Sequence, residues 1–344
     1  MQSVPAGETV QFPAQDGPEE VVQGVWRIPV PLPFALRSAN IYLLDDGPGG
    51  RTLIDSGLGL PADEQALREG LAQAGSALQD ISTLVLTHAH PDHIGLSGLI
   101  YADSRAPIYM LEGEEQHLTT VWGEGGDALQ TRLDEMYRVN GLPDDLRATG
   151  QHSSRRLRRI LRLPPLDAVS TLHDGQQIVL GAHTFQTIWT PGHSDYHLCL
   201  LRDDGLFIAG DHILPGITPN IGLYVGGRPN PLADYFVGLE KVQDLPARLV
   251  LPGHRRPFEG LAERAAELRE HHDERSQQTH DILAAHHAGL DAFHVAGELF
   301  GERLRNADDW RFALAETLAH LEYLRFADLA TRAERDGLQI YWVA

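Results

Sequence analysis

Apolar residues in the first two thirds of the chain fall into short runs that turn-forming residues separate. Runs rich in β-branched and other apolar side chains predict β-strands. These strands are expected at residues 21–28, 40–44, 51–55, 81–86, 177–180, 183–189, 199–201 and 206–209. Apolar residues at helical spacing predict helices at 63–74 and 96–101. Strands and helices therefore alternate here, after a polar lead-in over residues 1–20, and no repeat of fixed period is visible.

One long interval departs from this alternation. His93 and His193 are separated by 99 residues, more than alternating strands and helices require. The sequence at about 112–165 is polar and helix-forming. It predicts a helical insertion that caps or walls a site.

The last part of the chain is helical in character. Helices are predicted at 261–287, 292–299 and 309–335, followed by a break at Asp336-Gly337 and a strand at 338–343. Helices followed by a turn and a short strand resemble a winged-helix module, so we expect two domains, 1–258 and 259–344. Five histidines of this part are expected at the surface, because adjacent positions do not share a helix face. They are His271, His272, His280, His286 and His287.

The charge balance disfavours a polyanionic partner. The 344 residues include 48 Asp and Glu against 28 Lys and Arg, a formal net charge of −20. Residues 261–344 carry 16 acidic and 9 basic side chains, a net charge of −7. Nucleic-acid binders usually have a basic surface, because neutralised phosphates supply most of the non-specific affinity. We therefore expect the C-terminal part to pack against the N-terminal domain, forming a pocket wall or a homodimer contact.

A basic run at 155–162 is the local exception, with five arginines in eight residues. Leu157, Ile160 and Leu161 could form the apolar face of a short helix, leaving the arginines outside. A solvated helix face is one interpretation. The other is an anion-binding patch for a phosphate-bearing substrate such as a coenzyme A thioester.

The same composition suggests a cytoplasmic protein. The first residues lack the basic and apolar regions of a secretory signal, and no apolar stretch approaches the roughly 20 residues of a transmembrane helix. Cys199 is the only cysteine, so no intrachain disulfide can form. It lies in an apolar run and is expected to be a small core residue.

Residues 87–95 carry the strongest chemical signal. They read Thr-His-Ala-His-Pro-Asp-His-Ile-Gly, directly after the apolar run at 81–86. Pro91 argues against a helix here, so a loop leaving a strand is expected to gather the side chains at one point. Imidazole and carboxylate are ligands of zinc and its first-row neighbours. Three further segments end an apolar run with Gly followed at once by an acid or an imidazole, at His193, Asp211 and His254.

These segments resemble the metallo-β-lactamase-fold hydrolases, whose signature is His-x-His-x-Asp-His with distant His, Asp and His ligands. The resemblance implies a four-layer αββα sandwich in the α/β class, with the helical insertion and winged-helix-like domain added to it. It also implies two divalent metal ions, zinc above all, although iron or manganese suit the same ligands. One ion would be held by His88, His90 and His193, the other by Asp92, His93 and His254, with Asp211 bridging them.

Two further residues are expected behind the ligands. Asp55 matches the family's early strand-end aspartate, which supports the ligands through hydrogen bonds. His197 matches the second histidine of a Gly-His-Ser-x-x-His element, and is either such a support or a core residue. His212, Tyr224 and Arg228 are candidate pocket residues. For each of them, packing or loop anchoring is an equal alternative.

This ligand set implies hydrolysis by a metal-held hydroxide, with Asp92 also orienting the attacking water. The favoured substrate is a thioester, of the acyl-CoA kind, or a related carboxylic ester, and the expected partner is this small acyl molecule. A phosphodiesterase or endoribonuclease, a lactonase and a mononuclear iron oxidase remain enzyme alternatives. A DNA-binding regulator that kept a metal domain is the alternative outside enzymes.

Overall fold

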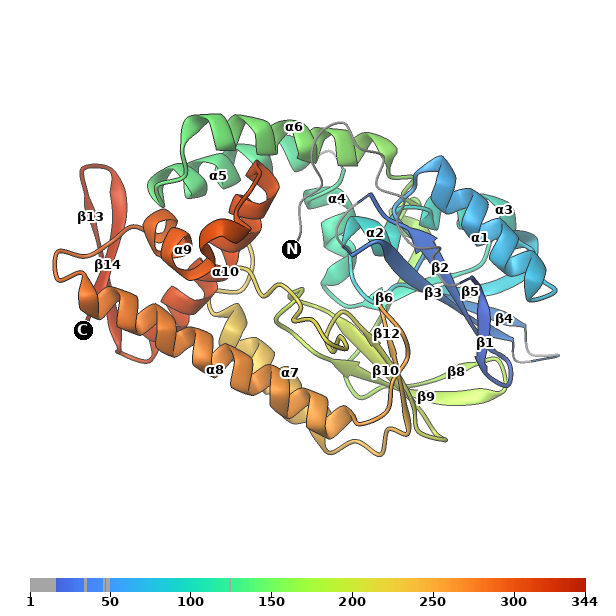
Figure 1. The fold of residues 1–344 in the computed structure, drawn as a ribbon. Helices are drawn as coiled ribbons and strands as arrows, with labels where there is room; N and C mark the ends of the chain where they lie inside the picture. Colours follow the sequence, from blue (N-terminus) through green and yellow to red (C-terminus); the bar gives the residue numbers. More distant parts are fainter. Residues whose placement is uncertain (1–16, 34–35, 46, 48–49, 124) are drawn as a thin grey trace.

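Two β-sheets lie face to face in the computed structural model, which describes residues 17–33, 36–45, 47, 50–123 and 125–344 (Figure 1). The first sheet contains, in spatial order, β1 (Glu19–Val22), β2 (Val25–Pro31), β3 (Ser38–Asp45), β4 (Arg51–Ile54), β5 (Ile81–Val85), β6 (Ile108–Leu111) and β7 (Val169–Leu172). Its strands are antiparallel from β1 to β4 and parallel from β4 to β7.

The second sheet is smaller and mostly antiparallel. It contains, in spatial order, β12 (Leu249–Pro252), β11 (Leu206–Gly210), β10 (Leu198–Arg202), β9 (His183–Trp189) and β8 (Gln177–Leu180). Only the β11–β12 pair is parallel. A third, two-stranded sheet pairs β13 (Ala330–Arg335) with β14 (Leu338–Val343).

Helices cover the outer face of each large sheet. The α-helices are α1 (Pro61–Gln73), α2 (Pro91–Ile94), α3 (Ser97–Ser104), α4 (His117–Thr120), α5 (Gly126–Val139), α6 (Asp144–Ile160), α7 (Pro231–Gln243), α8 (Leu261–Ala285), α9 (Ala292–Phe300) and α10 (Ala307–Phe326). Short 3-10 turns occur at Leu78–Asp80, Glu114–Gln116, Leu166–Ala168 and Gly301–Arg303. Helices α1 and α3 pack on the first sheet, whereas α7 and the start of α8 pack on the second.

Alternation along the strands builds this layering. In β3, Ile41 and Leu43 pack in the core beneath α1, while Tyr42 and Leu44 face the second sheet. In the same way β11 directs alternate residues toward α7 and toward the first sheet. Because successive side chains of a strand point to opposite faces, each large sheet buries both its faces. This arrangement confirms the predicted αββα sandwich.

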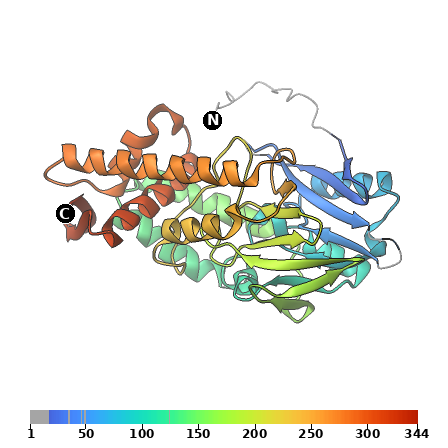
Figure 2. The same ribbon diagram turned by 90° about the horizontal axis from the view of Figure 1, so that it is seen from below.

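The helical insertion and the C-terminal helices share a core. Tyr137 of α5 and Leu142, just before α6, pack with Leu314 and Leu318 of α10 and with Tyr341 of β14. Figure 1 shows α5 and α6 lying across α9 and α10, and Figure 2 shows this helical part extending from one end of the sandwich. The insertion is therefore attached to the C-terminal part as well as to the layers of the sandwich.

The C-terminal part has the order of a winged-helix module: three helices, α8 to α10, and then the β13–β14 hairpin. Leu290 adds an isolated β-bridge to Tyr341 beside this hairpin. The domain boundary at residue 258 stays a prediction. No helix in the described part of the chain is both long and apolar enough to cross a membrane.

Four expectations were wrong, three about secondary structure and one about the exposure of a side chain. The predicted strand at 21–28 is two strands, β1 and β2, because Gly24 takes a positive φ of 75° and reverses the chain. The predicted helix at 309–335 ends at Phe326, and Ala330–Arg335 is a strand that pairs with β14 along its length. All of that strand except Ala330 is exposed, so burial left no periodic signal.

The other two concern Pro91 and His272. Residues Pro91–Ile94 form the short helix α2, because proline is tolerated at the first helical position, where its missing N–H needs no partner. His272 is fully buried against His320 of α10 instead of lying at the surface. The predictions also omitted β6, β7 and α7. The lead-in at residues 1–16 lies outside the described residues.

Candidate metal centre

The residues of the predicted cluster come from strand ends at one edge of the sandwich. His88 and His90 follow β5, and Asp92 and His93 lie on α2 directly behind them. His193 follows β9, Asp211 follows β11 and His254 follows β12. Parallel neighbours such as β4 and β5, or β11 and β12, end at the same edge of a sheet. Segments up to 166 residues apart in the sequence thereby meet in one place.

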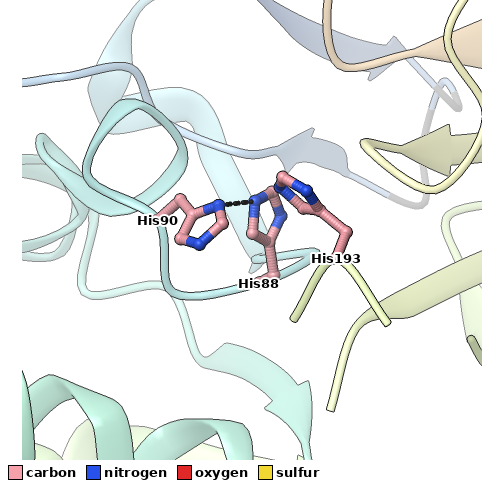
Figure 3. A group of neighbouring side chains, drawn as sticks. All are labelled: His88, His90 and His193. Atoms are coloured by element: carbon pink, nitrogen blue, oxygen red, sulfur yellow. Dashed lines mark hydrogen bonds between the residues drawn. The ribbon is translucent and has the colours of Figure 1, made fainter. Parts of the chain in front are cut away.

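Three overlapping groups of candidate ligands form there. In each group, one nitrogen or carboxylate oxygen from every member lies within 4.8 Å of the others. The groups are His88, His90 and His193; Asp92, His93 and His254; and His88, His93 and Asp211. Figure 3 shows the rings of the first group turned toward one another, with 2.9 Å between His88 Nε2 and His90 Nδ1. The structure thus brings together all seven predicted ligands.

Hydrogen bonds on the outer side fix three of the rings. His93 Nδ1–H donates to Asp55 Oδ2 at 2.8 Å, His193 Nδ1–H to the Asn220 carbonyl at 3.0 Å, and His254 Nδ1–H to the Ser38 carbonyl at 2.7 Å. This fixes the tautomer and directs each Nε2 inward.

Several side-chain atoms that point toward the centre of the cluster lack hydrogen-bond partners. Nε2 of His93, His193 and His254, together with Asp211 Oδ1, are buried and have no hydrogen-bond partner among the described residues. The three nitrogens lie 3.6, 3.5 and 3.2 Å from the Asp211 carboxylate. Buried polar atoms are otherwise almost always paired, so four orphaned ones around one point fit a cation site.

Burial and charge give the two halves of the cluster different protonation. Burial lowers the pKa of His88, His193 and His90, the last to about 3, so these rings are neutral and can donate a lone pair. Burial also disfavours charge on His93 and His254, but the neighbouring carboxylates, Asp211 first among them, outweigh it and raise both pKa values. A bound cation would favour the neutral form of these two rings, because a ligating imidazole must be deprotonated.

Glycine leaves the space that Asp211 occupies. A Cβ on Gly253 would lie 2.2 Å from Asp211 Oδ1 and 2.9 Å from His93 Cε1. Real Cβ atoms do not approach so closely, so any other residue here would displace the carboxylate or the ring. The glycine that precedes His254 is therefore sterically required at this site.

Asp55 and His197 lie behind the cluster. The Asp55 carboxylate accepts from the backbone N–H of Thr87 at 2.8 Å and from its hydroxyl, as well as from His93. His197 Nε2 accepts from the Asp211 N–H at 3.1 Å while its Nδ1–H donates to Thr190 Oγ1 at 2.9 Å. Asp55 thus orients a ring, whereas His197 fixes the backbone of Asp211.

The three candidate pocket residues have partners within the protein. Arg228 makes a two-pronged ion pair with Asp234, at 2.6 and 2.9 Å. The Tyr224 hydroxyl donates to Asn220 Oδ1 at 3.2 Å. The buried ring of His212 packs edge-on against Tyr235 of α7. Contact of these residues with a substrate stays a prediction.

Glu114 was missed by the sequence predictions. It is buried beside α4, and its Oε1 accepts from the Ala89 N–H and from Ser194 Oγ–H, both at 2.6 Å. Burial alone would raise the Glu114 pKa, but bonds from His117, Ser194 and Ala89 lower it. Since Ala89 separates His88 from His90 and Ser194 follows His193, one carboxylate ties together the two loops of the first ligand group.

Comparison with known proteins gives a consistent picture. The model of the metallo-beta-lactamase superfamily matches residues 35–254. A metallo-beta-lactamase family protein of Thermus thermophilus is 32% identical, with a TM-score of 0.84 over 94% of this chain and 100% of that chain. The probable metallo-hydrolase YqjP of Bacillus subtilis is 27% identical over 93% of this chain and 98% of its own length. An atrochrysone carboxyl ACP thioesterase of Aspergillus fumigatus is 26% identical over 73% of this chain and 60% of its own length.

Proposed function

Because the chain belongs to the metallo-beta-lactamase superfamily, we propose that it is a binuclear metal-dependent hydrolase that acts on thioesters. The observation that carries the metal-dependent part is the set of four buried, unpartnered atoms around one point, on His93, His193, His254 and Asp211. A hydrolase with a preformed cation site needs no Ser or Cys nucleophile. Cys199 fits this view, because it is fully buried in the core behind the second sheet, as predicted.

The proximities support one division of the ligands between two divalent ions, zinc first among them. His88, His90 and His193 form one open triangle, and Asp92, His93 and His254 form the other. Asp211 lies between the two, with Oδ2 near His193 and His254 and Oδ1 near His93. A carboxylate that faces imidazoles of both groups is suited to bridging.

In hydrolysis the acyl–sulfur bond breaks, a water oxygen bonds to the acyl carbon, and the departing thiolate takes up a proton. Divalent ions bound here would lower the pKa of a water molecule and polarise the acyl oxygen. Asp92 is the most accessible carboxylate of the cluster, and its Oδ2 lies 3.4 Å from His254 Nε2. Asp92 would accept a hydrogen bond from the attacking water and hold it in line with the acyl carbon.

Two observations favour a thioester over a nucleic acid. The net charge of −20 repels polyanions, which bind proteins largely through basic surfaces. A relative that matches 73% of this chain carries the name of an acyl carrier protein thioesterase.

Replacement of Asp211 tests the proposal. Asp211→Ala should abolish hydrolysis of acyl thioesters and reduce the divalent metal bound per chain, because the carboxylate faces both ligand groups. Released thiol and metal content, by mass spectrometry, are the two measurements. The matched control is Asp203→Ala, which removes an exposed carboxylate from the turn between β10 and β11. This variant should retain both activity and bound metal. Full thioesterase activity in Asp211→Ala would contradict the proposed chemistry.

A further inference from the structure

The arginines of α6 differ in whether they have partners. Arg162, just past the helix, pairs with Glu64 at 2.7 Å, and Arg158 pairs with Asp127 at 2.7 Å while donating to the Gly126 carbonyl at 2.9 Å. Arg155, Arg156 and Arg159 are exposed, and no ion pair or hydrogen bond joins their side chains to any residue that the structure describes. The basic run at 155–162 therefore holds two arginines with carboxylate partners and three for which the described residues offer none.

Two of these unpartnered arginines face one hollow. An open pocket of about 400 Å³ is lined by Asp127, Arg155, Arg158 and Arg159. Small-molecule sites span about 300–1,000 Å³, so the pocket has room for a ligand group. Three guanidinium groups against one carboxylate leave a local charge of about +2, in a chain whose net charge is −20.

Helix stability accounts for only part of this arrangement. The helix dipole favours basic residues in the last turn of α6, which explains Arg158 and Arg159 but not Arg155. Arg155 and Arg159 are four residues apart on the same face, a spacing at which like charges destabilise a helix. An anionic ligand between them would remove that repulsion.

The pocket is connected to the metal centre through the start of the insertion. Trp122 Nε1–H donates at 2.6 Å to the carbonyl of Ala89, the residue between His88 and His90. Gly126, whose carbonyl holds Arg158, lies four residues after Trp122, a separation of at most about 14 Å along the chain. On its other side α6 packs by Leu157 and Ile160 against the core beneath the metal loop, as the apolar face predicted.

We propose that the pocket formed by Arg155, Arg158 and Arg159 binds the phosphate groups of a nucleotide-type thiol carrier, the class to which coenzyme A belongs. Guanidinium groups offer paired N–H donors that match phosphate oxygens, and such charge-assisted bonds are about twice as strong as neutral ones. The proposal rests on the proposed thioesterase function, since the carrier is the part of the substrate remote from the acyl group. Phosphate recognition here would bind the carrier while the metal centre acts on the thioester.

Direct binding tests the pocket without any catalysis. Adenosine 3′,5′-bisphosphate, the phosphate-rich part of coenzyme A, is titrated into the full-length protein by calorimetry, with adenosine as the uncharged comparison. The double variant Arg155→Gln/Arg159→Gln should weaken bisphosphate binding by roughly tenfold or more, as expected for losing charged hydrogen bonds. Arg156→Gln, an exposed arginine of the same helix outside the pocket, should leave it unchanged. Equal loss in both variants, or no binding to the native protein, would overturn the proposal.

Steady-state kinetics separate this proposal from the function on which it rests. Hydrolysis of an acyl-CoA is compared with that of the same acyl group on pantetheine, which lacks the phosphates. The double variant should raise KM for the acyl-CoA roughly tenfold or more with little change in kcat, and should leave the pantetheine ester unaffected. A native enzyme that hydrolyses both esters with the same KM overturns the phosphate pocket and leaves the thioesterase intact. Bisphosphate binding without hydrolysis of either ester contradicts the thioesterase alone.

Discussion

A single buried carboxylate connects the two loops of the first ligand group. Glu114 reaches the backbone of Ala89 and the hydroxyl of Ser194 through one oxygen, and its second oxygen lies 3.5 Å from His117 Nδ1. Glu114 is too distant in sequence from both histidine loops to belong to either of them. We infer that it holds the two histidine loops at the spacing that the proposed ion would require.

Glu114→Ala should weaken zinc binding by about 10–100-fold, because supporting hydrogen bonds to ligand loops have effects of this size. The buried Ala89 N–H would also lose its acceptor, lowering the free energy of unfolding by about 1–3 kcal/mol. Glu114→Gln keeps an oxygen in place and should recover most of both losses. Chelator competition and urea unfolding are the measurements, with the exposed Glu112→Ala as control. Zinc affinity unchanged in Glu114→Ala would show that the loops hold their positions alone.

For single residues, the sequence was informative where a short local motif carries the chemical signal. Four of the seven cluster residues lie within six positions, and the other three each follow a glycine, so their types and spacing were enough to single them out as candidates. Their role as metal ligands stays a prediction. Glu114 has no such signal. It is one of 48 acidic residues, and only the packing of the insertion shows that it is buried beside both loops.

Strand ends set the positions of the ligands, and glycine sets how closely two ends approach. Gly253 directly follows β12 and lies beside Gly210, the last residue of β11; the Gly253 N–H donates to the Gly210 carbonyl at 2.7 Å. Asp211 and His254 can therefore share one centre only if neither strand end carries bulk. The need for glycine here comes from the close approach of β11 and β12, and not from any single ligand.

Gly253→Ala should reduce zinc content and thioester hydrolysis strongly while the fold is retained, because the added Cβ would overlap Asp211 Oδ1. Metal analysis and circular dichroism measure the two effects separately. Gly297→Ala, in the middle of α9 with its nearest neighbour 3.7 Å away, is the matched control. It should preserve metal binding and stabilise the protein by up to about 1 kcal/mol. Full zinc loading in Gly253→Ala would contradict the steric account.

The elements that were predicted well are those with a buried face. Helices α1, α8 and α9 and most strands of the sandwich lie near their expected bounds, because burial imposes a period on the sequence. The wing strand β13 was predicted as helix, since all but one of its residues are exposed and follow a helical run. The β1–β2 turn depends on Gly24 alone, within an otherwise apolar stretch.

The molecule as a whole is tied together by the core between the insertion and the C-terminal part. Residues near 137 and near 318 pack in one cluster, although they belong to segments predicted as parts of different domains. Contacts of such sequence separation leave no local pattern, so they could not be predicted. The packing implies that the two segments stabilise each other.

Leu318→Ala should therefore lower the free energy of unfolding by about 2–5 kcal/mol, as for other buried leucines, within one cooperative transition. Urea denaturation followed by fluorescence and by circular dichroism tests whether both signals shift together. Leu329→Ala, at an exposed position of the same part, should change stability by less than about 0.5 kcal/mol. Two separate transitions, with only the later one shifted, would show that the C-terminal part unfolds independently.

The most direct test of the central claim is a zinc titration of the metal-free protein with thioester hydrolysis as the signal. The ligand arrangement predicts that activity is absent without metal and reaches its maximum at two equivalents of zinc per chain. Thioesterase activity in the metal-free protein, or saturation at a single equivalent of zinc or iron, would contradict the two-ion hydrolase proposed for this centre.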